Sequence, residues 1–158
     1  LRAAVEHERP FALLMLDLDD FKSFNDRRGH EAGNQLLKGI ASAIGTACRE
    51  SDLVYRYGGE EFAVIFPSKD LERALPHLEI LRETIAGSQF IVRGKKRPKK
   101  KPDVPTGKNH GKIKLKITIS IGVASRDDKN TTPEQLIKAA DQALYKAKKG
   151  GRNQVCSA

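Results

Sequence analysis

The pattern of hydrophobic positions predicts five strands along the chain. Apolar runs typical of buried strands occupy residues 11–16 and 62–66, and residues 52–57 form a strand that leads into the second run. Two further strands are predicted over 90–92 and 112–123. In the last of them isoleucine or leucine alternates with lysine, threonine or serine, as expected for a half-buried strand.

Three amphipathic helices are predicted between and after these strands. Apolar residues recur at intervals of three and four over 30–49 and 70–86, although Pro76 disturbs the second pattern. A third helix begins at Thr132, with proline at its first position and Gln135 at its third, and ends at Gly150-Gly151. The order of elements predicts an α+β sandwich, with one mostly antiparallel sheet and flanking helices largely on one face.

Two predicted turns carry several carboxylates. Gly58-Gly59 predicts a tight primed hairpin turn, and Glu60-Glu61 follow it directly. The strand over 11–16 ends in Asp17-Leu18-Asp19-Asp20, where alternation places Asp17 and Asp19 on one face. The hairpin alone could be an ordinary turn with solvated acids, but two acidic turns together favour an oxygen-ligand site for magnesium at phosphates.

The positive charge of the chain is concentrated in one segment. The 158 residues, which we interpret as one domain over 1–158, have a net charge of +9. Residues 93–116 hold eleven Lys or Arg and one Asp, so the remainder is nearly neutral and a domain-wide basic groove is not supported. We interpret 94–111 as a basic loop insertion. It is either a solvated loop or a contact for nucleic acid or another acidic surface.

Cysteine use and hydropathy indicate the compartment. Cys48 and Cys156 are far apart without metal-ligand spacing, which is typical of reduced thiols. No run reaches the length of a membrane span, and no signal peptide precedes the first strand. We therefore expect a cytoplasmic domain, although a full-length protein could be anchored in a membrane.

Nine short motifs follow one another along the chain. They are Asp17-Leu18-Asp19-Asp20-Phe21-Lys22, Asn25-Asp26, Gly29-His30, Gly33-Asn34, Arg56 to Phe62, Ser120 to Val123, Ala140 to Tyr145, Ala147-Lys148 and Gly151-Arg152-Asn153. In this order they resemble the motifs of GGDEF domains, the diguanylate cyclases, over roughly residues 11 to 156 and in the GGEEF variant. The resemblance implies a palm-like fold, similar to ferredoxin-like domains and class III nucleotide cyclases, and a chain that lacks an upstream sensor and the start of the domain.

The resemblance also implies an activity and a set of catalytic residues. Family members condense two GTP into cyclic di-GMP and two pyrophosphates, with two subunits facing each other as a homodimer. The magnesium ligands implied here are Asp17, the carbonyl of Leu18, and Glu60, with manganese as an alternative metal. Glu61 would assist the metal or accept the hydroxyl proton, and Lys22 would neutralise charge in the transition state.

Further roles are implied for substrate and product binding. Lys148 and Arg152 would otherwise be ordinary charges at a helix end, and His30 an ordinary residue at a helix start. Arg49 and Asp52 resemble the family's inhibitory site for cyclic di-GMP, although R-x-x-D alone is close to a chance match. The implied substrate-binding residues are Asp20, Phe21 and Lys22 at the phosphates, Asn25 and Asn34 at guanine, Gly59 at the ribose, His30, Lys148 and Arg152.

One base-reading position departs from the family. Asn34 stands where members usually carry an aspartate, which accepts hydrogen bonds from both N1–H and the amine of guanine; an amide accepts only with its oxygen. We therefore expect relaxed base selectivity. Two alternatives remain open: a catalytically weak or silent GGDEF domain that binds cyclic di-GMP or GTP as a sensor, and a nucleic-acid-binding module that acts through the lysine-rich loop.

Overall fold

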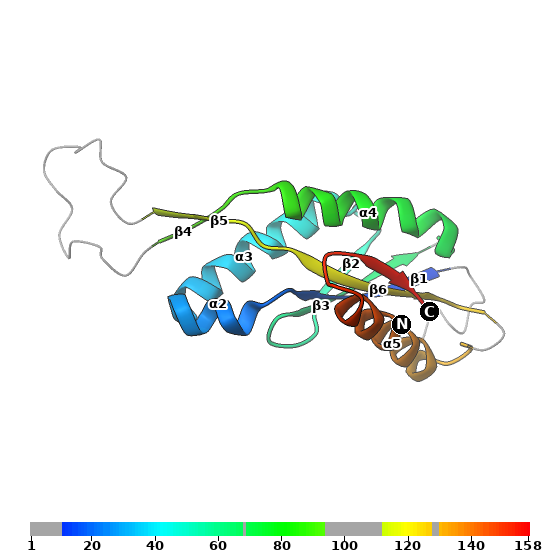
Figure 1. Cartoon of the computed structure of the whole chain (residues 1–158). Coiled ribbons are helices and arrows are strands. Elements are labelled where there is room, and N and C mark those ends of the chain that lie inside the picture. Colours follow the sequence, from blue (N-terminus) through cyan, green and yellow to red (C-terminus); the bar gives the residue numbers. More distant parts are fainter. Residues whose placement is uncertain (1–10, 68, 94–111, 128–129) are drawn as a thin grey trace, which may run out of the picture.

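The core of the molecule is a five-stranded sheet. The computed structural model describes residues 11–67, 69–93, 112–127 and 130–158. The strands run in the order β2-β3-β1-β6-β7, and all neighbours are antiparallel except β6 and β7 (Figure 1). Their bounds are β1 Phe11–Leu18, β2 Leu53–Arg56, β3 Glu61–Pro67, β6 Ile119–Ser125 and β7 Val155–Ser157.

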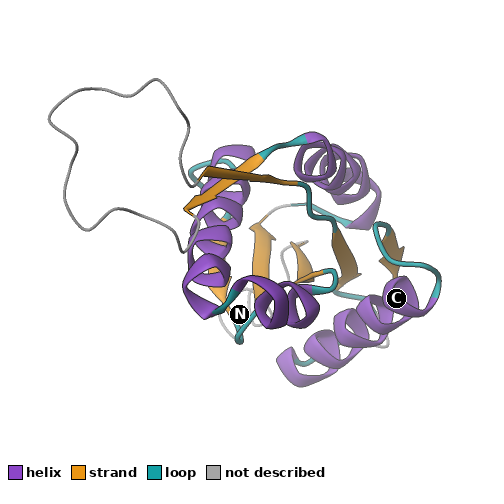
Figure 2. Ribbon diagram, turned by 60° about the vertical axis from the view of Figure 1, so that its left-hand side comes forward, coloured by secondary structure: helices purple, strands orange, loops and turns teal. Residues whose placement is uncertain are grey.

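Helices cover both faces of this sheet. The helices are α2 (Phe21–Arg28), α3 (His30–Ala47), α4 (Leu71–Gly87) and α5 (Pro133–Lys149). Leu14 and Leu16 of β1 pack in the core formed with α2, α3 and α4, whereas Leu13 and Met15 pack with α5 on the opposite side. Figure 2 shows the strands between these helices. The expected α+β fold is confirmed, but α5 does not share the face of the other helices.

The close contact between α5 and β6 depends on a glycine. A Cβ atom at Gly122 would meet the backbone of Ala140 and Leu144 in α5. The helix itself begins as expected, with the Thr132 hydroxyl accepting from Gln135 N and the Gln135 side chain accepting from Thr132 N. This start and this contact fix where α5 ends, and therefore where Lys148 emerges.

A separate two-stranded hairpin extends from the body. It pairs β4 (Phe90–Arg93) with β5 (Lys112–Leu115) and lies beside α3, where Phe90 packs over Gly39. The single strand predicted over 112–123 is therefore wrong. The chain leaves β5 after Leu115 and enters the main sheet at Ile119 as β6, so one alternating pattern serves two different sheets.

Two elements were not predicted at all. The helix α2 has buried residues only at Phe21 and Phe24, too few for a clear helical period. The strand β7 has three residues and pairs in parallel with β6 at the sheet edge. Both elements border the acidic turn after β1, and they decide how that turn is enclosed.

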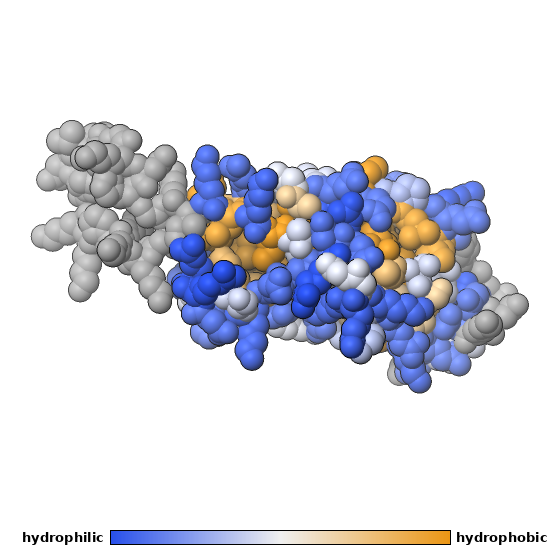
Figure 3. All heavy atoms as spheres, in the orientation of Figure 1, coloured by the Kyte–Doolittle hydropathy of each residue, from blue (hydrophilic) through white to orange (hydrophobic). Residues whose placement is uncertain are grey.

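One face of the described surface is mainly hydrophilic. In the view of Figure 3 hydrophilic residues cover most of the face, and hydrophobic atoms appear in separate areas between them. Among the described helices, none is both long enough and apolar enough to cross a bilayer. The basic loop predicted over 94–111 lies outside the described residues. The two cysteines, Cys48 and Cys156, are free thiols.

Candidate functional site

The two acidic turns meet at one end of the sheet. Asp17 near the end of β1 pairs in register with Glu61 at the start of β3. The backbone N–H of Leu18 donates to the carbonyl of Glu60 at 3.4 Å. Antiparallel pairing of β1 with β3 thus brings together carboxylates that are more than forty residues apart in the sequence.

Asp17 has one carboxylate oxygen without a partner. The residue is 4% exposed, and its Oδ1 atom is buried without a hydrogen bond. Its Oδ2 atom lies 2.7 Å from Nζ of Lys148, which reaches in from the last turn of α5. Burial raises the pKa of Asp17, and the nearby Asp19 raises it further, although the bond to Lys148 opposes both effects. Such a buried oxygen is a ready ligand for a cation.

Glu60 is a second carboxylate with a raised pKa at this site. Partial burial raises the pKa of Glu60, with a further increase from the negative charges of Asp17 and Glu61; Lys148 acts in the opposite direction. Burial is the largest cause of the raised pKa of both Asp17 and Glu60, and the neighbouring negative charges add to it. A bound cation would favour the charged form of both carboxylates.

Asp19, in contrast, is fully engaged in structural hydrogen bonds. Its Oδ1 accepts from the Ser120 hydroxyl at 2.6 Å, and its Oδ2 accepts from the Thr118 hydroxyl at 2.6 Å and from Asn153 N at 3.0 Å. Asp17 and Asp19 are therefore both buried but are not equivalent, since only Asp17 has a free oxygen. Asp19 ties β1 to the segment before β6 and to the turn between α5 and β7.

Sequence reasoning missed this bonding pattern. The alternating pattern places Thr118 and Ser120 on the open face of a half-buried strand, yet Ser120 is 0% exposed. The available signal was their spacing of two residues, which directs both hydroxyls to the same side. The Asn153 amide could not have been found from local pattern, because 134 residues separate it from Asp19.

The start of α2 forms a group of backbone donors beside the acids. Asp20 has a left-handed backbone, φ 56°, and its side chain makes no capping bond to the helix. The first N–H groups of a helix have no intrahelical acceptor, and they favour anions such as phosphate. The predicted phosphate residues Asp20 and Phe21 lie at this helix start, and their role in binding phosphate stays a prediction.

A cavity of about 360 Å³ joins these features. It contains most of the predicted metal and phosphate residues, including three cationic side chains, Lys22, Lys148 and Arg152. Arg152 pairs with Asp20 across the cavity at 3.6 Å. The sequence did not point to Ser23 and Asp26 as lining residues. The full lining is Asp17, Leu18, Asp19, Asp20, Phe21, Lys22, Ser23, Asp26, Glu60, Lys148 and Arg152.

The glycine turn differs from the predicted tight primed turn. A type I′ turn needs positive φ at both central residues, but within the described residues the only glycines with positive φ are Gly29 and Gly151. Strand pairing ends at Arg56 and Phe62, so the connection is longer than the two residues of a primed turn. Arg56 closes it by donating to the carbonyls of Gly58 at 3.2 Å and Gly59 at 2.7 Å. A side chain at Gly59 would meet nothing within 4 Å, which leaves room there for a ligand.

The predicted base-reading residues lie in two different environments. Asn34 is exposed on α3 and lines a second cavity of about 560 Å³ together with Arg56 and Phe62. Asn25 instead has a buried, unpartnered Oδ1 atom that lies against Gly33. His30 is exposed at the start of α3 and lines neither this cavity nor the phosphate cavity.

Arg49 and Asp52 form a separate polar pair. Arg49 Nη2 lies 3.3 Å from Asp52 Oδ1, and Arg49 N donates to Asp52 Oδ2 at 2.9 Å. The following residue, Leu53, pairs with Ile65, four residues along β3 from Glu61, which is about 13 Å at the usual rise of a strand. The pair therefore lies well away from the acidic turns, as a distinct regulatory site requires.

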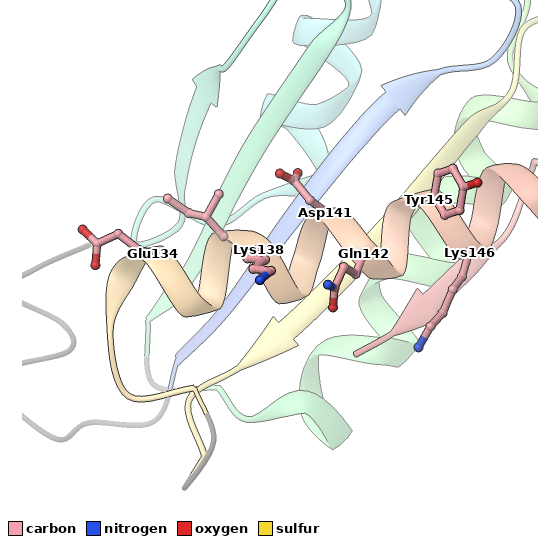
Figure 4. Close-up of a pocket in the computed structure, with 7 residues that line it drawn as sticks. Glu134, Lys138, Asp141, Gln142, Tyr145 and Lys146 are labelled. Atoms are coloured by element: carbon pink, nitrogen blue, oxygen red, sulfur yellow. The ribbon is translucent and has the colours of Figure 1, made fainter.

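A larger depression, of about 840 Å³, lies along the outer face of α5. Its lining comes from one helix and includes Glu134, Lys138, Asp141 and Lys146 (Figure 4). These charged groups are spread over three turns and do not converge on one point, as Figure 4 shows. None of the predicted site residues lies there, so we assign the chemistry to the smaller cavity between β1, β3 and α2.

The residues of the smaller cavity fit a divalent cation with oxygen ligands. The donors are the unpartnered Asp17 oxygen, the Glu60 carboxylate and a backbone carbonyl, which is the oxygen chemistry that magnesium prefers. Among the described residues no group of three or more His, Cys, Asp and Glu side chains is placed to hold a metal. A cation here would therefore also need oxygens from a ligand, as magnesium does at nucleotide phosphates.

Comparisons with known proteins agree on one family. The model of the family "Diguanylate cyclase, GGDEF domain" matches residues 1–102 and 99–154. The response regulator PleD of Caulobacter vibrioides is 40% identical over 146 residues, which is 92% of this chain but only 29% of PleD.

Two solved structures show the same fold. The active GGEEF domain of a diguanylate cyclase from Vibrio cholerae has a TM-score of 0.79 at 27% identity, over 99% of this chain and 90% of that one. The GGDEF domain of DgcB from Caulobacter crescentus, solved with cyclic di-GMP, has a TM-score of 0.77 at 33% identity, over 98% of this chain and 81% of that one.

Proposed function

The chain belongs to the GGDEF domain family, and from this premise we propose that it is a diguanylate cyclase module that condenses two GTP into cyclic di-GMP and two pyrophosphates. The observation that carries the proposal is the buried, unpartnered oxygen of Asp17 beside Glu60 and the free helix start of α2. Cation ligands and phosphate donors in one cavity are what nucleotidyl transfer needs.

The metal ligands in this proposal are Asp17, the carbonyl of Leu18, and Glu60, with magnesium as the expected ion and manganese as a substitute. When bound, such an ion would polarise the phosphoryl oxygens of the nucleotide. The protein's own part is to hold the triphosphate. Backbone N–H groups at Asp20 and Phe21 face the phosphates, and Lys22 neutralises charge that develops on them.

Glu61 is the proposed proton acceptor for the attacking 3′-hydroxyl, and its alternative role is to assist the metal. Its partner in register, Asp17, keeps it next to the metal ligands. The hydroxyl oxygen forms a bond to the α-phosphorus of the other GTP while the bond to pyrophosphate breaks, and the hydroxyl proton passes to the carboxylate. As the resemblance to the family implies, each copy of the domain would hold one nucleotide, and two copies would face each other as a homodimer.

Asn34 sets the proposed base selectivity. It lines the 560 Å³ cavity with Arg56 and Phe62, where a purine could be read, while Asn25 presents a buried oxygen nearby in the chain. An amide at this position can pair with adenine as well as with guanine. We infer relaxed selectivity between GTP and ATP.

Arg49 and Asp52 form the proposed inhibitory site for cyclic di-GMP. An exposed guanidinium beside a buried carboxylate suits a ligand with phosphates and guanine edges. Since this chain spans 29% of PleD, we expect further domains in the intact protein, an upstream sensor among them. A contact of residues 93–116 with nucleic acid or another acidic surface rests mostly on residues outside the described part of the chain.

A catalytically silent domain that senses cyclic di-GMP or GTP is the second candidate. The observation in its favour is Asn34, which weakens the expected contact with guanine. The test is incubation with GTP, ATP and their mixture in Mg²⁺, with products identified by mass. We expect cyclic di-GMP from the wild-type chain and none from Glu60→Gln, whereas Glu134→Gln on the outer face of α5 should act like wild type.

Absence of any cyclic dinucleotide from the wild-type chain, together with binding of cyclic di-GMP or GTP, would favour the sensor. Full turnover by Glu60→Gln with an unchanged circular dichroism spectrum would refute the metal assignment.

A further inference from the structure

Lys148 occupies the position of a cation at the acidic turn. Its Nζ lies 2.7 Å from Asp17 Oδ2, and its side chain is 38% exposed whereas that of Asp17 is 5% exposed. The partly exposed lysine side chain thus contacts a buried carboxylate from the solvent side. Among the described groups near Glu60, it is also the one whose positive charge counteracts the rise in that residue's pKa.

The same ammonium group lines the phosphate cavity. Lys148 in the last turn of α5 and Arg152 in the turn after the helix line the same cavity as the start of α2. Arg152 is paired with Asp20, at the rim, and Lys148 with Asp17, at the base. A triphosphate held on α2 would therefore offer Lys148 a second set of anionic oxygens within the cavity.

Asp17 cannot serve Lys148 and a divalent cation equally well. Magnesium holds its ligands at about 2.0–2.1 Å in a nearly ideal octahedron. An ammonium group on the same buried carboxylate would lie close to the metal ion, and the two positive charges would repel each other strongly. With Lys148 in place, the carboxylate is already neutralised and offers only Oδ1. A cation gains full access to Asp17 only when the ammonium leaves.

We propose that Lys148 is an exchangeable counter-ion, which neutralises Asp17 in the empty domain and moves to the nucleotide phosphates when substrate and metal bind. The inference rests on the proposed nucleotide and metal site, and it concerns the order of binding rather than the reaction. It predicts that a divalent cation alone binds weakly, because it competes with Lys148. Nucleotide strengthens metal binding by removing the competitor.

The test is a titration of the whole chain with Mn²⁺ alone, followed by electron paramagnetic resonance of the free ion. In Lys148→Met the Kd for Mn²⁺ should fall by about tenfold, the order expected when one charge-assisted hydrogen bond no longer competes. Lys149→Met is the matched control, because Lys149 is the next residue on α5 and contacts the Tyr145 ring instead of an acid. It removes the same charge and should bind Mn²⁺ like wild type.

A second measurement separates exchange from a merely structural role. A GTP analogue that cannot react should strengthen Mn²⁺ binding in wild type clearly more than in Lys148→Met, since the mutant has no competitor to remove. Lys148→Arg, which keeps the charge, should retain the wild-type Kd for Mn²⁺ alone. If Lys148→Met does not fold without metal, Mn²⁺ should restore its melting transition, and failure to restore it would overturn the proposal.

Equal or weaker Mn²⁺ binding by folded Lys148→Met would also overturn the proposal, whatever the activity of the enzyme. Conversely, a wild-type chain that makes no cyclic dinucleotide but shows the tenfold difference would refute the proposed cyclase activity. The exchange would then remain a property of a nucleotide-binding domain. The two failures are therefore distinguishable.

Discussion

Replacing Asp19 by alanine should destabilise the fold without touching the proposed metal ligands. The carboxylate accepts three hydrogen bonds, from the hydroxyls of Ser120 and Thr118 and from Asn153 N. The Ser120 hydroxyl is fully buried and would lose this acceptor, while Thr118 and Asn153 are more exposed and can find water. A buried donor without an acceptor costs about 1–3 kcal/mol. With the two weaker losses, we expect Asp19→Ala to lower the free energy of unfolding by about 2–4 kcal/mol.

Asparagine at the same position is the matched variant. Its carbonyl can accept from Thr118 and Asn153, and its amide can donate to the Ser120 oxygen, because a hydroxyl both donates and accepts. Only the charge is lost, and we expect Asp19→Asn to lower the free energy of unfolding by about 1 kcal/mol or less. Ser120→Ala removes the buried donor together with its need for an acceptor, and it should cost less than Asp19→Ala.

The assay is urea unfolding followed by circular dichroism, with the free energy of unfolding compared among the three variants and wild type. The turn that carries Arg152 should also loosen in Asp19→Ala, which would raise the KM for GTP more than it lowers kcat. A loss below about 1 kcal/mol in Asp19→Ala, or an equal loss in Asp19→Asn, would refute this account of the bonding.

Three further outcomes are expected. Asn34→Asp should restore both contacts to guanine and raise the affinity for GTP roughly tenfold to a hundredfold. It should also suppress adenine-containing products from equimolar GTP and ATP, and unchanged product ratios by mass would contradict this. Cyclic di-GMP should slow turnover, and Arg49→Ala should relieve that inhibition at unchanged basal rate, whereas equal inhibition of both chains would indicate competition at the catalytic cavity. Burial raises the pKa of Asp17 above 3.8, so the folded chain binds that proton more tightly than the unfolded chain. Without metal, the free energy of unfolding should therefore fall as pH rises from 3.8 through the raised value, and Asp17→Asn should remove this component of the pH profile; an unchanged profile in the variant would refute it.

Motif order in the sequence was sufficient to identify the family and to locate most of the cavity. Asp17, Lys22, Glu60, Lys148 and Arg152 were all named from the sequence, and the structure brings them together. Local periodicity also found the long helices, because each has a continuous apolar face.

The misses have physical causes in contacts between distant segments. Strand 112–123 divides between two sheets, and nothing in its alternation marks the break after Leu115. The glycine connection differs from the predicted two-residue turn because the backbone N–H groups of Tyr57 and Gly58 donate to the carbonyl of Glu61. Arg56 adds side-chain bonds to the carbonyls of Gly58 and Gly59, which local turn patterns do not indicate. That α5 lies alone on its face depends on β1 being apolar on both sides, which the buried run at 11–16 allowed but did not specify.

The position of α5 has a consequence for biosynthesis. Phe11, Leu13 and Met15 of β1 and Ile65 of β3 are covered by a helix that ends only at Lys149, near the end of the described chain. During translation the apolar residues that β1 and β3 contribute to this face are made more than sixty residues before α5, and Ala124 of β6 completes the face shortly before the helix begins. A nascent chain at that stage is expected to need a chaperone, and messages truncated before residue 133 should yield aggregates and no partly active enzyme.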